Sequence, residues 1–507
     1  MTQQIKTTLQ HVLPPEWLQG IHELVFISGI QNDSRLVKPG DLFIAYAGAK
    51  ADGRRFIEQA WQQGAAAVLI EADQCAVAQS HHGRWLLQAP RLRSHLSQIA
   101  SRFFQEPSQH CTVIGITGTN GKTTLCYVLA QALQQLGHRC AMIGTLGQGF
   151  LHQLTETANT TPDALAVQRH LAGFVSQGAE YVVMEVSSHG IDQDRVTAVH
   201  FDTAVLTQIG RDHLDYHQTL AAYVAVKTRL FCWPGLRHVV INGDDAFAAH
   251  FLSAISPDIL STRYGLTADL DITAQDWQPS EEGSCAWVVR RAIEQECASL
   301  QTLLWGQFNV YNLLAALSVL LGLGIDFNQA LDVLAAVSAP PGRLELVSRD
   351  GQAQPCVLVD YAHTPDALEV VLSTIRQHCR QRWQQGGQLI CIFGCGGERD
   401  KGKRPLMGGV ASAQADKVIL TMDNPRSEDP LIIIQQIQAG CDAAIECQVI
   451  LDRGAAIDHA IQQAQRHDVI LIAGKGHETT QIMGSHSFPS DDRVFARRAL
   501  SNYWPIG

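Results

Sequence analysis

One short segment constrains the fold of this chain more than any other. A glycine-rich stretch stands between the apolar run TVIGIT and a helix-spaced run that ends before Gly137. Its residues are Gly118, Thr119, Asn120, Gly121, Lys122, Thr123 and Thr124. In such a loop backbone N–H groups surround phosphate oxygens, a lysine reaches the outer phosphates and a threonine hydroxyl can bind Mg²⁺. The stretch predicts a phosphate-binding loop, although Ile116 occupies the position of the first glycine in the strict motif.

Length and pattern together predict three α/β domains. A chain of 507 residues corresponds to about three domains at roughly 150 residues each. Apolar runs that end in Gly, Asp or His turns alternate with helix-spaced segments, which is typical of α/β folds. We place boundaries after RFFQEPSQH and at SAPPGRLE, giving domains 1–105, 106–338 and 339–507. The central domain is predicted to be a P-loop mononucleotide-binding domain with a parallel-rich sheet, and the third to be Rossmann-like.

Composition excludes several classes of protein. Hydrophobic residues make up 46% and charged residues 17%, which is typical of a globular chain. The net charge of −11 argues against a nucleic-acid binder. The longest nearly apolar stretch, 313–325, is too short to cross a bilayer, and the polar start has no signal-peptide pattern, so we expect a cytoplasmic protein without membrane insertion. We expect a monomer, with Cys391 and Cys395 as buried apolar side chains.

Two charged residues in the central region fall where charges are costly. Glu185 ends the apolar run YVVME, where a carboxylate either binds Mg²⁺ or forms a salt bridge. Lys227 shares a helical face with Leu220, Tyr223 and Phe231. The lysine could extend its ammonium to the surface, or burial could lower its pKa and leave a neutral amine for covalent chemistry.

Two further polar sites flank the second predicted boundary. Asn309 and Asn312 lie three residues apart on one face of a predicted helix from 309 to 323. Their amides suit the edge of a nucleotide base, although Asn309 could also cap the helix. Arg343 could reach phosphates when domains close, or could be an ordinary surface charge.

The last third of the chain contains four apolar runs that each end at a polar cluster: CVLVD, LICIFG, KVILTMD and DVILIAG. In an open parallel sheet these clusters meet at the carboxyl edge, where ligands bind. They contain Arg399, Asp423, Asn424, Arg426 and Glu478. This mixture of charges suits a zwitterionic ligand, although solvated loop charges are the alternative.

Taken together, the motifs resemble the Mur ligase family over nearly the whole chain. The similar segments are TGTNGKTT, MEVSSHG, DHLDYH followed by Lys227, FNVYN, PPGRLE, DYAHTPD, FGCGGERDKGKRP, DNPR and GKGHE. The N-terminal DSR and GDLFIAYAGAKADGRRF resemble the UDP-binding domain of that family. Gln208 and Gly210 depart from the usual family pattern at a position associated with a substrate hydrogen bond.

The resemblance implies a role for each matching residue. It implies catalytic roles for Lys122, Glu185, His213 and Lys227, with Lys227 carbamylated. It implies Mg²⁺ binding by Thr123, Glu185 and His213, and ATP binding by the loop from Gly118 to Thr124 with Asn309, Arg343 and Asp360. Contacts to the UDP-sugar dipeptide are implied for Ser34, Arg35, Asn159, Thr160, Thr161, Ser187, Arg195 and carbamylated Lys227. Diaminopimelate contacts are implied for Arg399, Asp423, Asn424, Pro425, Arg426, Gly474 and Glu478.

The implied reaction is amide formation driven by ATP in peptidoglycan precursor synthesis. ATP would phosphorylate the D-Glu γ-carboxylate of UDP-N-acetylmuramoyl-L-Ala-D-Glu, and an amine of meso-diaminopimelate would attack the acyl phosphate. Arg426 would bind the far carboxylate of this acceptor, which L-lysine lacks. An L-lysine-adding relative, a folylpolyglutamate-type ligase and a nucleotide-dependent switch without amide chemistry are the alternatives.

Overall fold

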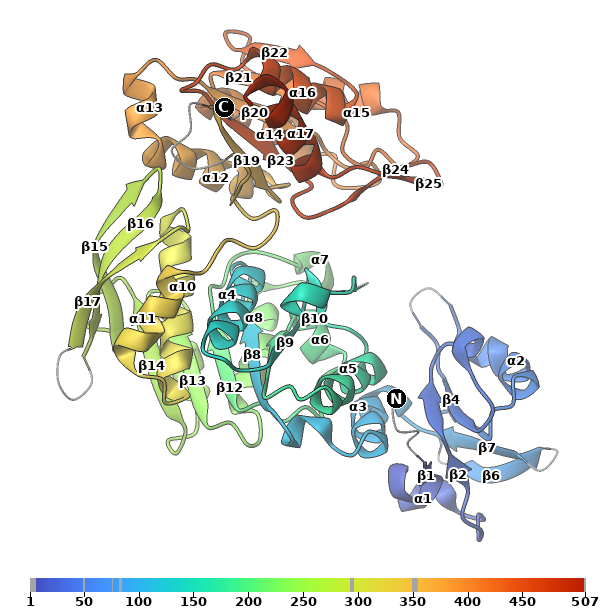
Figure 1. The fold of residues 1–507 in the computed structure, drawn as a ribbon. Coiled ribbons are helices and arrows are strands. Elements are labelled where there is room, and N and C mark those ends of the chain that lie inside the picture. Colours follow the sequence, from blue (N-terminus) through green and yellow to red (C-terminus); the bar gives the residue numbers. More distant parts are fainter. Residues whose placement is uncertain are drawn as a thin grey trace. The chain divides into compact units, whose positions relative to one another are not determined.

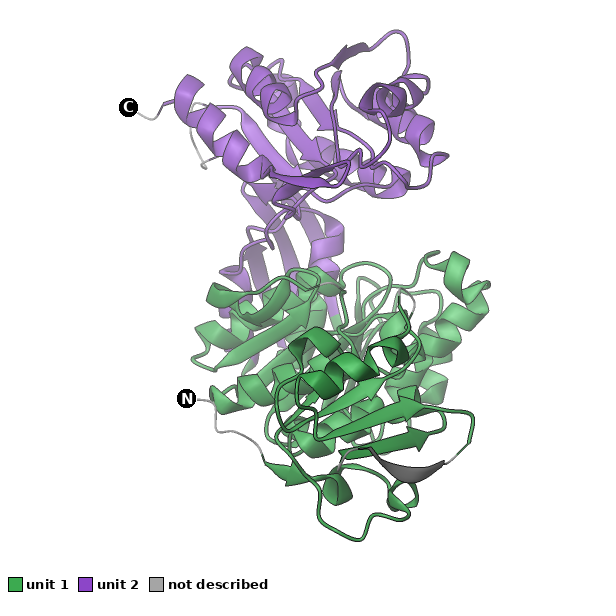
Figure 2. Ribbon diagram, turned by 90° about the vertical axis from the view of Figure 1, so that its right-hand side faces the viewer, with its two compact units in different colours: residues 1–272, 314–326 green, residues 273–313, 327–507 purple. Residues whose placement is uncertain are grey.

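The computed structural model describes residues 6–48, 51–74, 76–81, 84–157, 159–291, 296–348 and 354–505. The chain divides into two compact units, Met1–Ile272 with Leu314–Asp326 and Thr273–Leu313 with Phe327–Gly507 (Figure 2). The predicted boundaries near residues 105 and 339 stay predictions. No helix among the described residues is both long enough and apolar enough to cross a membrane.

The N-terminal part of the first unit is built on a five-stranded sheet (Figure 1). The strand order is β3 (Gly29–Gln31), β4 (Asp41–Ala45), β5 (Ala67–Glu71), β7 (Arg84–Ala89) and β6 (Ala76–His81), with only β6 antiparallel to its neighbour. Leu42 and Leu69 pack into one core, and Phe43 and Val68 pack into another. Because successive side chains alternate between faces, both faces of this sheet are buried. Helices α2 (Ile57–Gln62) and α3 (Leu92–Phe103) follow β4 and β7.

The rest of the first unit contains a larger sheet that carries the glycine-rich loop. Its order there is β10 (Gly147–Phe150), β9 (Cys140–Gly144), β11 (Tyr181–Glu185), β8 (Thr112–Thr117), β12 (Thr203–Leu206), β13 (His238–Asn242) and β14 (Leu260–Gly265). All these pairings are parallel except that of β10 with β9. The predicted strand at 112–117 and the helix after it, α4 (Lys122–Gln135), are confirmed. Strands β8 and β9 are not neighbours, because β11 lies between them.

The α-helices that follow β10 in this part of the first unit are α5 (Ala164–Ser176), α6 (Ser188–Asp192), α7 (Leu214–His217), α8 (Leu220–Thr228) and α9 (Ala248–Ala254). Lys227 lies in α8, and Ser187 and His213 directly precede α6 and α7. The apolar residues of β8, β11 and β12 are almost fully buried, including Val113, Val182 and Ala204. The candidate residues at the strand ends are therefore held by a packed core.

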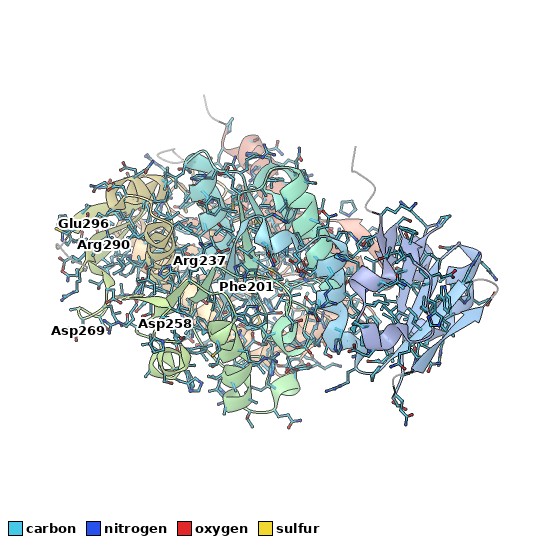
Figure 3. All side chains as sticks on the ribbon, turned by 90° about the horizontal axis from the view of Figure 1, so that it is seen from below. Phe201, Arg237, Asp258, Asp269, Arg290 and Glu296 are labelled. Atoms are coloured by element: carbon cyan, nitrogen blue, oxygen red, sulfur yellow. The ribbon has the colours of Figure 1, made fainter. Side chains whose placement is uncertain are left out.

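The second unit begins with three strands. Strands β15 (Ile272–Ser280), β16 (Gly283–Arg290) and β17 (Glu296–Thr302) are neighbours in that order. Arg290 and Glu296 are register partners of β16 and β17, and their side chains form an ion pair of 2.6 Å (Figure 3). Helices α10 (Gln307–Gly322) and α11 (Phe327–Ala335) come next in the chain, and Leu314–Asp326, which contains most of α10, is part of the first unit. Helix α10 confirms the predicted helix near 309–323.

A six-stranded sheet forms the remainder of the second unit. Its order is β18 (Glu345–Leu346), β19 (Cys356–Asp360), β23 (Val469–Ala473), β20 (Leu389–Phe393), β21 (Lys417–Leu420) and β22 (Glu446–Val449). Only β18 is antiparallel, so the four predicted strands end at one edge as expected. Cys391 and Cys395 are 0% and 3% exposed, which confirms them as buried side chains.

Helices lie between and after the strands of this sheet in the sequence, and a β-hairpin follows β23. The helices are α12 (Pro365–His378), α13 (Arg380–Gln384), α14 (Lys403–Gln414), α15 (Pro430–Gln438), α16 (Arg453–Gln463) and α17 (Asp492–Tyr503). Strands β24 (Thr480–Met483) and β25 (His486–Pro489) form the hairpin. Two apolar cores, one containing Leu358 and the other Val359, cover the two faces of β19.

Candidate active site

The glycine-rich loop lies between β8 and α4, as predicted. Gly118 has a φ of +144° and Gly121 a φ of +88°, conformations that side chains disfavour. A Cβ atom on Gly118 would lie 1.9 Å from the hydroxyl of Thr207, so only glycine fits at this position of the loop. The Thr207 hydroxyl also donates to the carbonyl of Asn120 over 2.6 Å. Lys122 begins α4, which points the free N–H groups of that helix toward the loop, as in phosphate sites.

Two lysines converge on this loop. The Lys122 Nζ donates to the carbonyls of Gly118 (2.9 Å) and Thr119 (2.7 Å). The Lys227 Nζ donates to the same Gly118 carbonyl (2.9 Å) and to the hydroxyl of Thr117 (3.2 Å). Lys227 is only 1% exposed, so the alternative of an ammonium extended to the surface is wrong. Burial first, and the charge of Lys122 second, hold the pKa of Lys227 well below its ordinary value.

Glu185 is the buried carboxylate beside the loop. It ends β11, which pairs with β8 so that Glu185 is the register partner of Ile116. One carboxylate oxygen accepts from the Thr123 hydroxyl (3.0 Å) and the other from the backbone N–H of Thr145 (2.8 Å). A Cβ atom on Gly144 would lie 2.2 Å from this carboxylate. A carboxylate and a hydroxyl side by side next to a phosphate loop form a donor set that fits Mg²⁺.

His213 lies at the start of α7, with a φ of +52°. Its Nε2 is 3.5 Å from a carboxylate oxygen of Asp212, and its ring centroid is 4.7 Å from that of His189. Among the described residues, no three His, Cys, Asp or Glu side chains are grouped to hold a metal. His189, in α6, also packs 4.3 Å from Tyr216. The sequence analysis assigned no role to His189, although the residue lies inside the MEVSSHG segment.

The residues expected to contact the dipeptide gather beside Glu185. The Thr161 hydroxyl donates to the Glu185 carbonyl (2.8 Å) and accepts from the Ser187 N–H (2.9 Å). Arg195 donates to the Thr161 carbonyl over 2.6 Å. The Thr160 hydroxyl lies 3.0 Å from that of Thr145, whose N–H contacts Glu185. Asn159 is exposed, and its carbonyl accepts from the Thr157 hydroxyl (2.8 Å).

The residues expected at the uridine end lie in the N-terminal part of the same unit. Ser34 donates to the side chain of Gln59 over 2.8 Å, and Arg35 pairs with Asp33 over 2.6 Å. The Arg35 side chain is 80% exposed. The Asn32 side chain, two residues before Ser34, donates to the carboxylate of Asp163 over 3.5 Å.

The remaining residues expected to bind ATP belong to the second unit. The Asn309 amide donates to the carbonyl of Trp305 (2.8 Å) and accepts from Asn312 (3.0 Å), so the two lie on one helix face as predicted. Asn309 is inside α10 and donates to a carbonyl, so it does not cap the helix. Arg343 stacks its guanidinium 4.5 Å from the ring centroid of Tyr361, and its Nε has no hydrogen-bond partner among the described residues.

Asp360, the last residue of β19, is held by backbone donors. Its two carboxylate oxygens accept from the N–H groups of Leu344 and Ala362, each over 2.7 Å. Burial raises the pKa of Asp360. The backbone bonds fix the carboxylate next to the Arg343 and Tyr361 pair.

The DNPR turn forms the centre of the predicted acceptor cluster. The Asn424 side chain accepts from the Ile482 N–H (2.9 Å) and donates to the Glu478 carboxylate (2.8 Å). Arg426 donates to the Gly397 carbonyl over 2.7 Å. Asn424 and Arg426 both have positive φ, +45° and +51°, so the turn is tightly wound. Side chains that follow β21 and β23 thus meet here, and the segment that follows β20 joins them through the backbone of Gly397.

The other acceptor residues surround this turn. Asp423 is buried, which raises its pKa, and one of its oxygens would lie 2.6 Å from a Cβ on Gly474. The Pro425 carbonyl would lie 1.9 Å from a Cβ on Gly397, so the two loops touch through their backbones. Arg399 is exposed and forms no ion pair within the described part of the chain. Among the described residues, its guanidinium has no carboxylate partner and can bind a ligand carboxylate.

The fold and site define a class: an α/β protein with a phosphate-binding loop and a buried carboxylate on the neighbouring strand. Its sequence matches three domain families, the Mur ligase family catalytic domain (26–103), the Mur ligase middle domain (116–320) and the Mur ligase glutamate ligase domain (342–476). The chain belongs to the Mur ligase family, and it is therefore an enzyme of the ligase class.

Similar proteins share this family across nearly their whole length. A UDP-N-acetylmuramoyl-L-alanyl-D-glutamate--2,6-diaminopimelate ligase of Coxiella burnetii is 45% identical over 481 residues, covering 94% of this chain and 96% of the relative. An enzyme of that name from Pseudomonas aeruginosa is 45% identical, covering 92% and 94%. A solved structure of that name has a TM-score of 0.68 at 36% identity, covering 94% and 95%. MurF from Acinetobacter baumannii shares the fold, with a TM-score of 0.61 at 18% identity, covering 94% and 93%.

Proposed function

We propose that this enzyme joins meso-2,6-diaminopimelate to the D-Glu γ-carboxylate of UDP-N-acetylmuramoyl-L-Ala-D-Glu. ATP is the co-substrate, and ADP and phosphate are formed. The reaction belongs to peptidoglycan precursor synthesis in the cytoplasm, and the enzyme acts as a monomer on small molecules. The observation that carries the proposal is the Arg426 turn beside Asn424 and Glu478, in a chain whose relatives are named for this reaction.

The loop from Gly118 to Thr124 binds the ATP phosphates in this proposal. Lys122 now bonds to loop carbonyls, and it exchanges these bonds for phosphate oxygens when ATP binds. Thr123, Glu185 and His213 are the residues that would hold Mg²⁺, which neutralises charge on the transferring phosphoryl group. Asn309, Arg343 and Asp360 serve the adenosine end of ATP.

Lys227 acts as a carbamate in the proposed mechanism. Its buried environment favours the neutral amine, whose nitrogen can form a bond to carbon dioxide and release a proton to solvent, which leaves a carbamate anion. The dipeptide lies along Thr160, Thr161, Ser187 and Arg195. This places its γ-carboxylate near the loop for phosphorylation, and positioning supplies much of the rate enhancement.

The acceptor binds at the carboxyl edge of the six-stranded sheet. Asp423 and Glu478 supply negative charge for an ammonium group, and the guanidiniums of Arg399 and Arg426 supply positive charge for carboxylates. An L-lysine acceptor would leave the Arg426 charge without a partner, which disfavours it. L-Lysine is the second candidate acceptor, because it shares the other groups of meso-diaminopimelate.

The experiment that tests the reaction is ADP release with each substrate omitted in turn. We expect turnover only with ATP, the UDP-dipeptide and meso-diaminopimelate together, and a product whose mass equals dipeptide plus acceptor less one water. ADP release that does not depend on the acceptor would instead support a nucleotide-dependent switch.

A further inference from the structure

Arg404 is the largest fully buried side chain among the described residues, with 0% exposure. It lies in α14, directly after the GCGGERDKGK segment, and its charge is matched by several acceptors. Its Nη1 donates to Glu428 (3.0 Å) and Gln436 (2.6 Å), and its Nη2 donates to the other Glu428 oxygen (3.1 Å) and to the Gly396 carbonyl (3.1 Å). Such a fork fixes both partners in position and orientation.

Glu428 continues this contact into the two acceptor loops. The same carboxylate accepts from the backbone N–H of Glu398 over 2.5 Å, and the Lys401 ammonium lies 3.5 Å away. The Arg404 guanidinium, followed by the Glu398 N–H, lowers the pKa of Glu428 to about 2. The carboxylate is therefore charged at neutral pH, and it remains a firm acceptor for both donors.

The loops tied together in this way carry the two candidate arginines. Residues 396–398 precede Arg399, and residues 424–428 contain Arg426. The loops also meet directly, because the Gly397 N–H donates to the Asn424 carbonyl (3.1 Å) and Arg426 donates to the Gly397 carbonyl (2.7 Å). Arg404 itself has no exposed atom to offer a ligand, so it can act only through these loops.

We propose that the Arg404–Glu428 pair is a positioning device that sets the spacing of Arg399 and Arg426, and thereby the affinity for an acceptor with two carboxylates. The proposal rests on the proposed function for its choice of acceptor. A bidentate ion pair fixes both the distance between its two partners and their relative orientation, and a single hydrogen bond fixes these less firmly. A shift of about 1 Å between charged groups that grip one ligand is enough to weaken binding strongly.

Three variants and one control test the proposal. Arg404→Met removes the guanidinium, Arg404→Lys keeps the charge without the fork, and Glu428→Gln keeps the shape without the charge. The control is Arg382→Met, which removes another arginine of the second unit that pairs with a glutamate, Glu281, over 2.8 Å. Arg382 also donates to the carbonyl of Arg466, which precedes β23 and so lies at the opposite edge of the sheet.

We expect the KM for meso-diaminopimelate to rise about 10- to 100-fold in Arg404→Met and less in Arg404→Lys. The KM values for ATP and the UDP-dipeptide should change by less than about twofold, and Arg382→Met should leave all three unchanged. If Arg404→Met does not fold, the two milder variants carry the test. An acceptor KM within about twofold of wild type in both milder variants, or an equal rise in all three KM values, overturns the proposal.

A second readout needs no substrate. Hydrogen exchange at the Gly397 and Glu398 N–H groups should be at least about tenfold faster in Arg404→Lys, while exchange at Leu389, bonded to Asp416, stays the same. Unchanged exchange at both amides overturns the positioning role whatever the acceptor is. If the wild-type enzyme does not use meso-diaminopimelate, the proposed function is refuted instead. Failure of the positioning role and failure of the proposed function can therefore be distinguished.

Discussion

Lys122 and Lys227 donate hydrogen bonds to one acceptor, the carbonyl oxygen of Gly118, each over 2.9 Å. Two ammonium groups at one oxygen repel each other, and the repulsion is relieved when one loses its proton. Lys227 is the buried partner, so burial and repulsion both favour its neutral form. In the proposed mechanism this relationship suits the two lysines to different tasks, a charged side chain for phosphates and a neutral amine for carbamate formation.

Lys227→Met should lower kcat by at least about 100-fold. At pH 8 the folded state of this variant should be more stable than that of the wild type. The pKa of Lys227 is lowered from 10.5 in the folded state, so the folded protein binds fewer protons than the unfolded chain below pH 10.5. The free energy of unfolding of the wild type therefore rises as the pH increases toward 10.5. Denaturant unfolding in buffer free of carbon dioxide should show the advantage of Lys227→Met shrinking toward pH 10.5. A variant less stable than wild type at pH 8 would contradict this prediction.

Glu185→Gln should raise the Mg²⁺ concentration needed for half-maximal ADP release. The substitution keeps the shape beside the Thr123 hydroxyl but removes the charge that attracts a divalent cation. We expect kcat to fall by about 100-fold or more even at saturating Mg²⁺. Glu180→Gln is the matched control, because Glu180 directly precedes the same strand at its other end. Equal Mg²⁺ dependence in the two variants would show that Glu185 has only a structural role.

Asp492→Asn should destabilise the second unit. Asp492 and Arg453 are 0% and 3% exposed and form two bonds of 2.7 Å with each other. Breaking such a buried pair typically costs about 3–5 kcal/mol, because one charge stays buried alone. Calorimetry should show a lower unfolding temperature in Asp492→Asn. The double variant Arg453→Met/Asp492→Met should lose less stability, and a larger loss would count against the interpretation.

His238 should make the first unit sensitive to acid. It is 4% exposed, its Nδ1 has no hydrogen-bond partner in the described part of the chain, and burial lowers its pKa from 6.5 to about 4. The folded state therefore resists protonation, and stability is lost as the pH falls from 6.5 toward 4, by up to about 3 kcal/mol. Unfolding measured against pH should show a shallower slope for His238→Gln. Replacing the exposed His250 by Gln should leave the slope as in wild type.

Local patterns predicted much of the fold. The strand, loop and helix around Gly118 and the four strands of the last sheet follow from apolar runs and turn residues, which depend on neighbours in the sequence. The arrangement of strands does not. Strand β11 inserts between β8 and β9, and this pairing brings Glu185 beside the loop. No spacing within one segment encodes such a long-range contact.

Some residues of the candidate site could be predicted from the sequence and others could not. The DNPR turn was found because its polar residues follow an apolar strand. Arg404 was not, because its sequence neighbours Lys401 and Lys403 suggest a solvated basic segment. Its partners Glu428 and Gln436 lie 24 and 32 residues away, and only the folded chain shows that the arginine is buried between them.

The acceptor preference of Arg426→Gln tests the central claim most directly. Position 426 has a positive φ, which disfavours arginine and glutamine alike. The substitution therefore removes the guanidinium without adding backbone strain. ADP release should be measured with ATP and UDP-N-acetylmuramoyl-L-Ala-D-Glu, with meso-diaminopimelate and L-lysine compared in wild type and variant. We predict that wild type strongly prefers meso-diaminopimelate and that the variant loses about 10²-fold or more of that preference. A wild-type preference for L-lysine, or a preference unchanged in Arg426→Gln, would contradict the account.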